Sequence, residues 1–60
     1  MFVELETRQN DGLTVSLEWE RETCKTQIVV ADIRDHSQIV AAVPPASAGD
    51  AFRHPFRYVP

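Results

Sequence analysis

The side chains with the most chemical potential are one cysteine and two histidines, and their spacing argues against a reactive or metal-binding site. Cys24, His36 and His54 are separated by 12 and 18 residues. Structural zinc sites usually use four ligands, often in close pairs such as Cys-x-x-Cys, and the chain contains no such pair. The only 2 glycines cannot form a Gly-rich phosphate loop. So short a chain is also expected to lack a pocket above about 300 Å³. We therefore expect no catalytic residue, no cofactor and no metal.

Four glutamates in the first third of the chain form a second candidate site. Glu4, Glu6, Glu18 and Glu20 occupy the alternate, polar positions of two predicted strands. In the expected pairing, Glu4 faces Glu18, and like charges opposite one another destabilise a sheet. Either these carboxylates form a solvated face that discourages aggregation, or they form a docking surface for a basic partner or a mimic of a nucleic-acid backbone.

The last twelve residues, GDAFRHPFRYVP, hold three of the five aromatic residues and two of the four prolines. Aromatic side chains bury the most area per residue, so this tail suits a lid over a small sheet. Alternatively, the tail stays exposed and acts as a binding arm, because arginine and aromatic residues are enriched at interface hot spots. The candidate partner-binding residues of the tail are Arg53, Phe56, Arg57 and Tyr58.

The segment from Asp50 to Tyr58, DAFRHPFRY, resembles the ending of a group of very short, uncharacterised actinobacterial proteins. Those proteins close on an Asp-Ala-Phe-x-His-Pro-Phe-like tail after a few strands. Their usual Ala-Leu-Asp lead-in reads Ala48-Gly49-Asp50 here, which implies a weaker helix in this chain. The resemblance implies a strand-plus-tail fold and carries no activity with it.

Charge and composition limit the class of protein. Six basic and nine acidic residues give a net charge of -3, which disfavours nucleic acid as a partner. The lone cysteine favours a reducing compartment. The start of the chain lacks the pattern of a signal peptide, and the apolar runs are too short to span a bilayer. We expect a cytoplasmic protein that binds another protein or a second copy of itself, with no membrane partner.

Period-two alternation predicts four strands, at about 2–9, 13–22, 26–34 and 38–43. Asn10-Asp11-Gly12 predicts a turn between the first two, and a three-residue loop there aligns their apolar residues on one face. The predicted pairs are Leu5 with Leu17, Val3 with Trp19 and Thr7 with Val15.

A second hairpin is predicted around Asp35-His36-Ser37, which suits an Asx turn. The preceding segment, TQIVVADIR, is apolar at both sets of alternating positions, as expected of an interior strand. A three-residue loop would pair Ile33 with Ile39, Ala31 with Ala41 and Val29 with Val43. Pro44-Pro45 then ends the fourth strand, because proline cannot donate to a strand ladder.

A short helix is predicted at about 47–53, with Ser47 as its N-cap and Asp50 as a shortened capping box. It should end before His54, since a residue that precedes a proline is pushed out of the helical region. The tail should continue in an extended conformation. The residues expected on the covered apolar face of the sheet are Val3, Leu5, Leu17, Trp19, Val29, Ala31, Ile33, Ile39 and Val43.

The predicted fold is therefore a single α+β domain, residues 1–60. Two hairpins form a small four-stranded antiparallel meander, with one short C-terminal helix and the aromatic tail packed on one face. Its expected function is that of a small non-catalytic protein-binding or regulatory module, acting through the acidic face or the aromatic and arginine tail. The alternative is a structural subunit that homo-oligomerises or completes a larger complex, through its sheet edges or by burying Ile28, Val30 and Ala42 on its second face.

Overall fold

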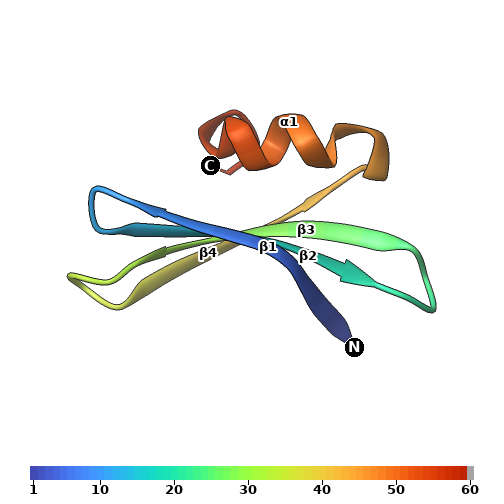
Figure 1. Cartoon of the computed structure of the whole chain (residues 1–60), viewed down its shortest axis with the longest axis horizontal. Helices are drawn as coiled ribbons and strands as arrows, with labels where there is room; N and C mark the ends of the chain where they lie inside the picture. Colours follow the sequence, from blue (N-terminus) through green and yellow to red (C-terminus); the bar gives the residue numbers. More distant parts are fainter. Residues whose placement is uncertain (60) are drawn as a thin grey trace.

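Four antiparallel strands form one meander sheet, and a short helical segment lies against one of its faces, which confirms the predicted α+β fold. The structure is a computed structural model that describes residues 1–59. Within these residues, α1 covers one face of the sheet and no other element covers the opposite face (Figure 1). The elements are β1 (Phe2–Asn10), β2 (Leu13–Glu20), β3 (Lys25–Asp32), β4 (Ser37–Val43), η1 (Pro45–Ser47), α1 (Ala48–Arg53) and η2 (Pro55–Arg57).

The first hairpin closes through a two-residue turn, so the predicted three-residue loop is wrong. Asn10 pairs with Leu13, which leaves only Asp11 and Gly12 in the turn. Both residues have positive φ, 52° and 79°. This is the type I′ geometry, whose backbone twist matches the right-handed twist of the flanking strands.

A β-bulge in β1 replaces the extra loop residue that we expected. The register shifts between Glu4 and Glu6, and the intervening Leu5 has no partner and is 51% exposed. A bulge inserts one unpaired residue into a strand. This residue compensates for the shorter turn, so the pairs between the bulge and the start of β1 have the predicted alignment. Val3–Trp19 and Glu4–Glu18 are therefore confirmed, whereas Leu5–Leu17 and Thr7–Val15 are wrong, because Leu17 pairs with Glu6 and Val15 with Arg8.

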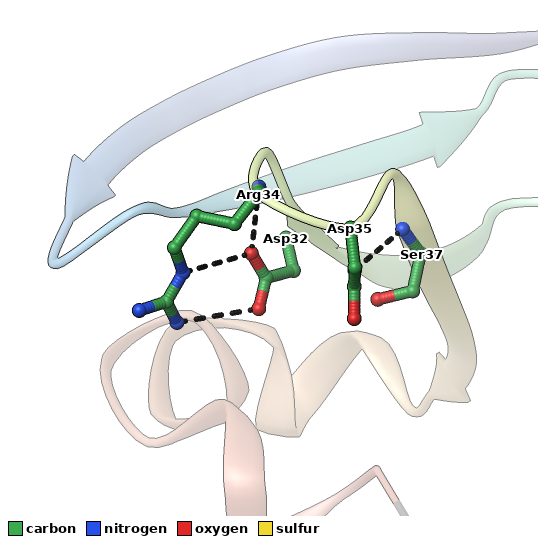
Figure 2. Close-up of polar contacts among 4 residues, drawn as sticks. All are labelled: Asp32, Arg34, Asp35 and Ser37. Carbon is green, nitrogen blue, oxygen red and sulfur yellow. Dashed lines mark hydrogen bonds and ion pairs between the residues drawn. The ribbon is translucent and has the colours of Figure 1, made fainter.

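The second hairpin has a four-residue loop, residues 33–36, because Asp32 pairs with Ser37. Aspartates hold this loop at both ends: the backbone N–H of Arg34 donates to Asp32 Oδ1 at 2.9 Å, and that of Ser37 donates to Asp35 Oδ1 at 2.9 Å (Figure 2). In each of these Asx turns, the aspartate carboxylate accepts a hydrogen bond from the backbone N–H two residues further along the chain. These bonds stabilise the four-residue loop. The three predicted pairs are wrong: Val29 pairs with Val40, Ala31 pairs with Gln38, and Ile33 lies in the loop.

The orientation of β3 is also opposite to the prediction. Ile28 pairs with Leu17 and Val30 with Val15, so these residues lie beneath α1, and Ile28 is 0% exposed. Val29, expected there, lies on the uncovered face with Ala31. We predicted that Ile28, Val30 and Ala42 would lie on the second, uncovered face of the sheet. Only Ala42 lies there, where it pairs with Gln27.

The core lies between the sheet and the C-terminal segment. Leu17 and Val43 belong to it as predicted, whereas the expected members Leu5 and Ile33 are more than half exposed. The tail does fold back, but as a turn of 3-10 helix rather than an extended segment. The buried apolar residues are Val15, Leu17, Ile28, Val30, Val43, Ala51 and Val59.

The helix ends at Arg53 as predicted, and Ser47 occupies the predicted N-cap position, but without the expected capping contact. Ser47 makes no side-chain capping bond, and η1 leads directly into the first turn of α1. The side chain of Asp50 instead accepts a hydrogen bond from the Tyr58 hydroxyl at 2.8 Å. The predicted capping box is wrong because this carboxylate is used to hold the tail.

Candidate functional site

A groove of about 570 Å³ opens between the first hairpin and the C-terminal segment. We call it the tail groove. It corrects the expectation that the chain is too short for a pocket above about 300 Å³. The residues that matter for its chemistry are Arg8, Asp11, Leu13, Arg53, Phe56 and Arg57.

Arg8 links the first strand to the end of α1. It pairs with the buried Val15, so its side chain lies on the same side of the sheet as the helix. Its Nη2 donates to the carbonyl oxygens of Phe52 at 2.9 Å and Arg53 at 3.0 Å. The last carbonyls of a helix have no partner within the helix, and a cation satisfies them well. The guanidinium also lies 5.4 Å from the centroid of the Phe52 ring, within reach of a cation–π contact.

The tail is held against α1 by a small polar cluster. Asp50 accepts from the Tyr58 hydroxyl at 2.8 Å, and its carboxylate lies 3.6 Å from Arg57 Nη1. The backbone N–H of Tyr58 donates to the carbonyl of Pro55 at 2.9 Å, which closes the 3-10 turn. This turn leaves the Phe56 ring 66% exposed beside the groove.

Basic residues outnumber acidic ones in the lining of the tail groove, although the chain as a whole is acidic. Three of the six basic residues, Arg8, Arg53 and Arg57, line it together with His54, against one carboxylate, that of Asp11. Arg53 forms no ion pair with any of residues 1–59. Leu13, Pro55 and Phe56 add an apolar surface next to these charges. Such a combination suits a ligand that carries both carboxylate and apolar groups.

Three of the four predicted tail residues line the tail groove, and the fourth, Tyr58, shares the carboxylate of Asp50 with Arg57. Arg53, Phe56 and Arg57 all line the tail groove, whereas the Tyr58 hydroxyl is engaged with Asp50. Arg8 is the residue that the sequence analysis missed. Its position among glutamates in an alternating strand indicated a solvent-exposed place, and only the bulge turns it toward α1.

One of the four glutamates of the predicted acidic site, Glu6, does not lie on the same face of the sheet as Glu4 and Glu18. Glu4 lies directly opposite Glu18 as expected, and Gln27 Nε2 donates to Glu18 Oε1 at 2.7 Å. Glu6, however, pairs with Leu17 and therefore lies on the helix side of the sheet. The amino group of Met1 contacts Glu20, and this contact, with the backbone N–H of Glu22, holds the pKa of Glu20 below its ordinary value.

Cys24, His36 and His54 lie in three separate loops of the described chain. Cys24 and His36 each adopt a positive φ, 57° and 62°, in the turns after β2 and β3. His54 lies after α1, beside the tail groove. No three His, Cys, Asp or Glu side chains within residues 1–59 converge in a way that could hold a metal ion.

The two edges of the sheet differ in chemistry. β1 carries Glu4, Glu6 and Arg8 and is interrupted by the bulge. β4, with the sequence SQIVAAV, carries no charge and no proline, and its register with β3 is unbroken. We call this strand, Ser37–Val43, the uncharged edge. A long, flat edge without charges offers unpaired backbone groups to another strand.

Comparison with known proteins adds no relative: no family, no curated protein and no solved structure matches the chain. In the described part of the chain, none of the helices has the length and apolar character needed to cross a membrane.

Proposed function

We propose that this protein is a small non-catalytic binding module whose tail groove binds an acidic, partly apolar segment of another protein. The observation that carries the proposal is the gathering of Arg8, Arg53 and Arg57 around one groove in a chain of net charge -3. Arginine presents planar donors that match a carboxylate. Phe56 adds an exposed aromatic ring beside these arginines. Arginine and aromatic residues are enriched among the residues that contribute most of the binding free energy at protein interfaces.

The acidic face is the weaker candidate for the docking surface. Glu18 already accepts a hydrogen bond from Gln27, and Glu20 is engaged with Met1 and Glu22. A partner would have to displace these contacts before it could use the carboxylates. In the tail groove, Arg8 and Arg57 are also engaged, with the last carbonyls of α1 and with Asp50, but the Arg53 guanidinium has no ion-pair partner among residues 1–59 to give up.

A role without catalysis fits the placement of the reactive side chains. Cys24 lies in the turn between β2 and β3, whereas the tail groove lies beside the turn between β1 and β2. These turns are at opposite ends of β2. A nucleophile and a general base must lie within hydrogen-bond reach of each other, and the thiol of Cys24 is remote from His54 in the groove.

The test measures the binding of a fluorescein-labelled peptide that alternates glutamate with phenylalanine, compared with a peptide in which glutamine replaces each glutamate. We expect the acidic peptide to bind and its affinity to fall as salt is raised, because interactions between exposed charges are screened. Arg53→Gln should weaken binding about tenfold, the equivalent of about 1.4 kcal/mol.

Arg21→Gln is the matched control, since it makes the same change in charge in the turn after β2, outside the groove. It should leave the affinity unchanged. Equal binding of both peptides, or equal losses in the Arg53 and Arg21 variants, would rule out the tail groove as a site for acidic segments.

A further inference from the structure

The uncharged edge stands out because the chain protects only one of its two sheet edges. Natural sheets block unwanted pairing with charges, prolines or bulges on their edge strands. β1 has both charges and a bulge, whereas β4 has neither in any of its seven residues. An edge left open in this way either aggregates or has a regular partner strand.

Apolar side chains next to the uncharged edge are only partly covered. Ile39 is 38% exposed on the helix side, and Val40 is 50% exposed on the uncovered face. Val40 pairs with Val29, and Ile39 pairs with Val30. A strand added beside β4 would therefore extend an apolar row on each face of the sheet.

We propose that β4 pairs antiparallel with the β4 of a second copy of this chain, giving one continuous eight-stranded sheet. A two-fold axis perpendicular to the sheet keeps both α1 helices on the same face. It also requires that one residue of β4 lies opposite the same residue of the second copy. Centring the axis on Val40, the middle residue of Ser37–Val43, pairs all seven residues. Ile39 then lies opposite Ala41 of the second copy, and Val40 opposite Val40.

This register completes apolar rows across the join. On the uncovered face, Val29 and Val40 meet Val40 and Val29 of the second copy in one line of four valines. On the helix side, Ile39 reaches Ala41 of the second copy, which pairs there with the fully buried Ile28. Cross-strand pairs of β-branched side chains of this kind stabilise a sheet.

Charge does not oppose pairing with a second copy, although each chain has a net charge of -3. The uncharged edge carries no ionisable side chain, so no like charges meet at the join. The nearest glutamates of the acidic face lie on β2, five strand spacings from β2 of the second copy, or about 24 Å. That separation exceeds the Debye length of about 8 Å at physiological salt, so the repulsion is screened.

The pairing also ends the assembly at two copies. Once the two β4 strands have joined, the outer edges of the combined sheet are both β1, each with its charges and its bulge. Neither can accept another strand readily. One unprotected edge per chain is therefore what a closed dimer needs.

The first experiment measures the mass of the protein in solution by light scattering. We expect a dimer at twice the chain mass of 6.8 kDa. Val40→Lys places two ammonium groups face to face on the two-fold axis and should halve the measured mass. Gln9→Lys adds the same charge on β1, the edge that we expect to stay free, and should leave the dimer intact.

The second experiment tests the register by oxidation, in a Cys24→Ser background so that the native thiol does not contribute. Residues opposite each other in an antiparallel pair have Cα atoms about 4.5–5.5 Å apart, within the range for a disulfide. Val40→Cys should therefore cross-link into a covalent dimer. Ala42→Cys should not, because the two copies of residue 42 would lie about 14 Å apart along the strands.

Circular dichroism of each variant shows whether the sheet is retained. A wild-type protein that stays at 6.8 kDa at high concentration would overturn the proposal. So would a dimer that survives Val40→Lys, or cross-linking of Ala42→Cys as efficient as that of Val40→Cys.

Discussion

Replacing Ile28 by alanine tests the orientation of β3, on which the whole core depends. Ile28 is the largest side chain that is fully buried, and it lies between the sheet and α1. An Ile→Ala change in a core costs about 2–5 kcal/mol, because it loses transfer free energy and leaves a cavity. A chain of this length has a total free energy of unfolding of about 3–9 kcal/mol, from about 0.05–0.15 kcal/mol per residue. We therefore expect Ile28→Ala to remove about half of the stability.

Val29→Ala is the matched control, because it changes the next residue on the opposite face of the same strand. Val29 is only half-buried, and the substitution removes two methyl groups. At about 0.8 kcal/mol for each fully buried carbon, half burial gives an expected loss of about 0.8 kcal/mol. The ratio of the two losses reports which face of β3 is in the core.

The free energy of unfolding is measured by urea denaturation, followed by the fluorescence of Trp19, the only tryptophan, and by circular dichroism. Each variant is measured at two protein concentrations ten-fold apart, because self-association would make the midpoint depend on concentration. Equal losses would show that Ile28 is not buried more deeply than Val29, and a larger loss for Val29→Ala would show that β3 presents Val29 to α1.

Three further substitutions test the turns and the link between β1 and α1. Gly12→Ala should cost about 1–2 kcal/mol, since the left-handed region penalises a Cβ, which would also lie 3.2 Å from Arg34 Nε; an unchanged midpoint of thermal unfolding would contradict this. Arg8→Ala should lower the free energy of unfolding by about 1 kcal/mol through the loss of its bonds to the end of α1, and Arg21→Ala should leave it unchanged. The Arg34 side chain and then its backbone N–H hold the pKa of Asp32 below its ordinary value. The ionised carboxylate therefore stabilises the fold at neutral pH, and the effect disappears as the pH falls through the lowered pKa. Asp32→Asn should therefore be less stable than the wild type at pH 7 and equal to it in strong acid; a difference that persists in acid would refute the role of the charge.

The local sequence of the chain was sufficient to predict the elements of the fold. Alternation in LTVSLEWE identified β2, the Asp-Gly pair identified the first turn, and the proline after His54 marked the end of α1. These signals act over a few residues, because side-chain direction, backbone φ and the missing proline N–H are local properties. The fold class, the strand order and the packing of the tail on one face followed from them.

The register and the buried face required the tertiary structure. TQIVVADIR is apolar at both sets of alternating positions, so periodicity could not distinguish Ile28 from Val29 as the core residue. Its pairing with Leu17 decided the matter, and that pairing is fixed by the length of the turn between β2 and β3, which Glu20 and Lys25 close. A shift of one residue turns every side chain of a strand to the other face, so small errors in loop length inverted the predicted face.

The candidate sites, like the fold, could be predicted from the sequence only in part. Arg53, Phe56 and Arg57 could be identified from the composition of the tail, but Arg8 joins them from a strand more than forty residues earlier. The uncharged edge was readable as a sequence without charges, yet a strand becomes an edge only through the order of the sheet. Residue types and local geometry are written along the chain, whereas proximity and exposure arise only when distant segments pack together.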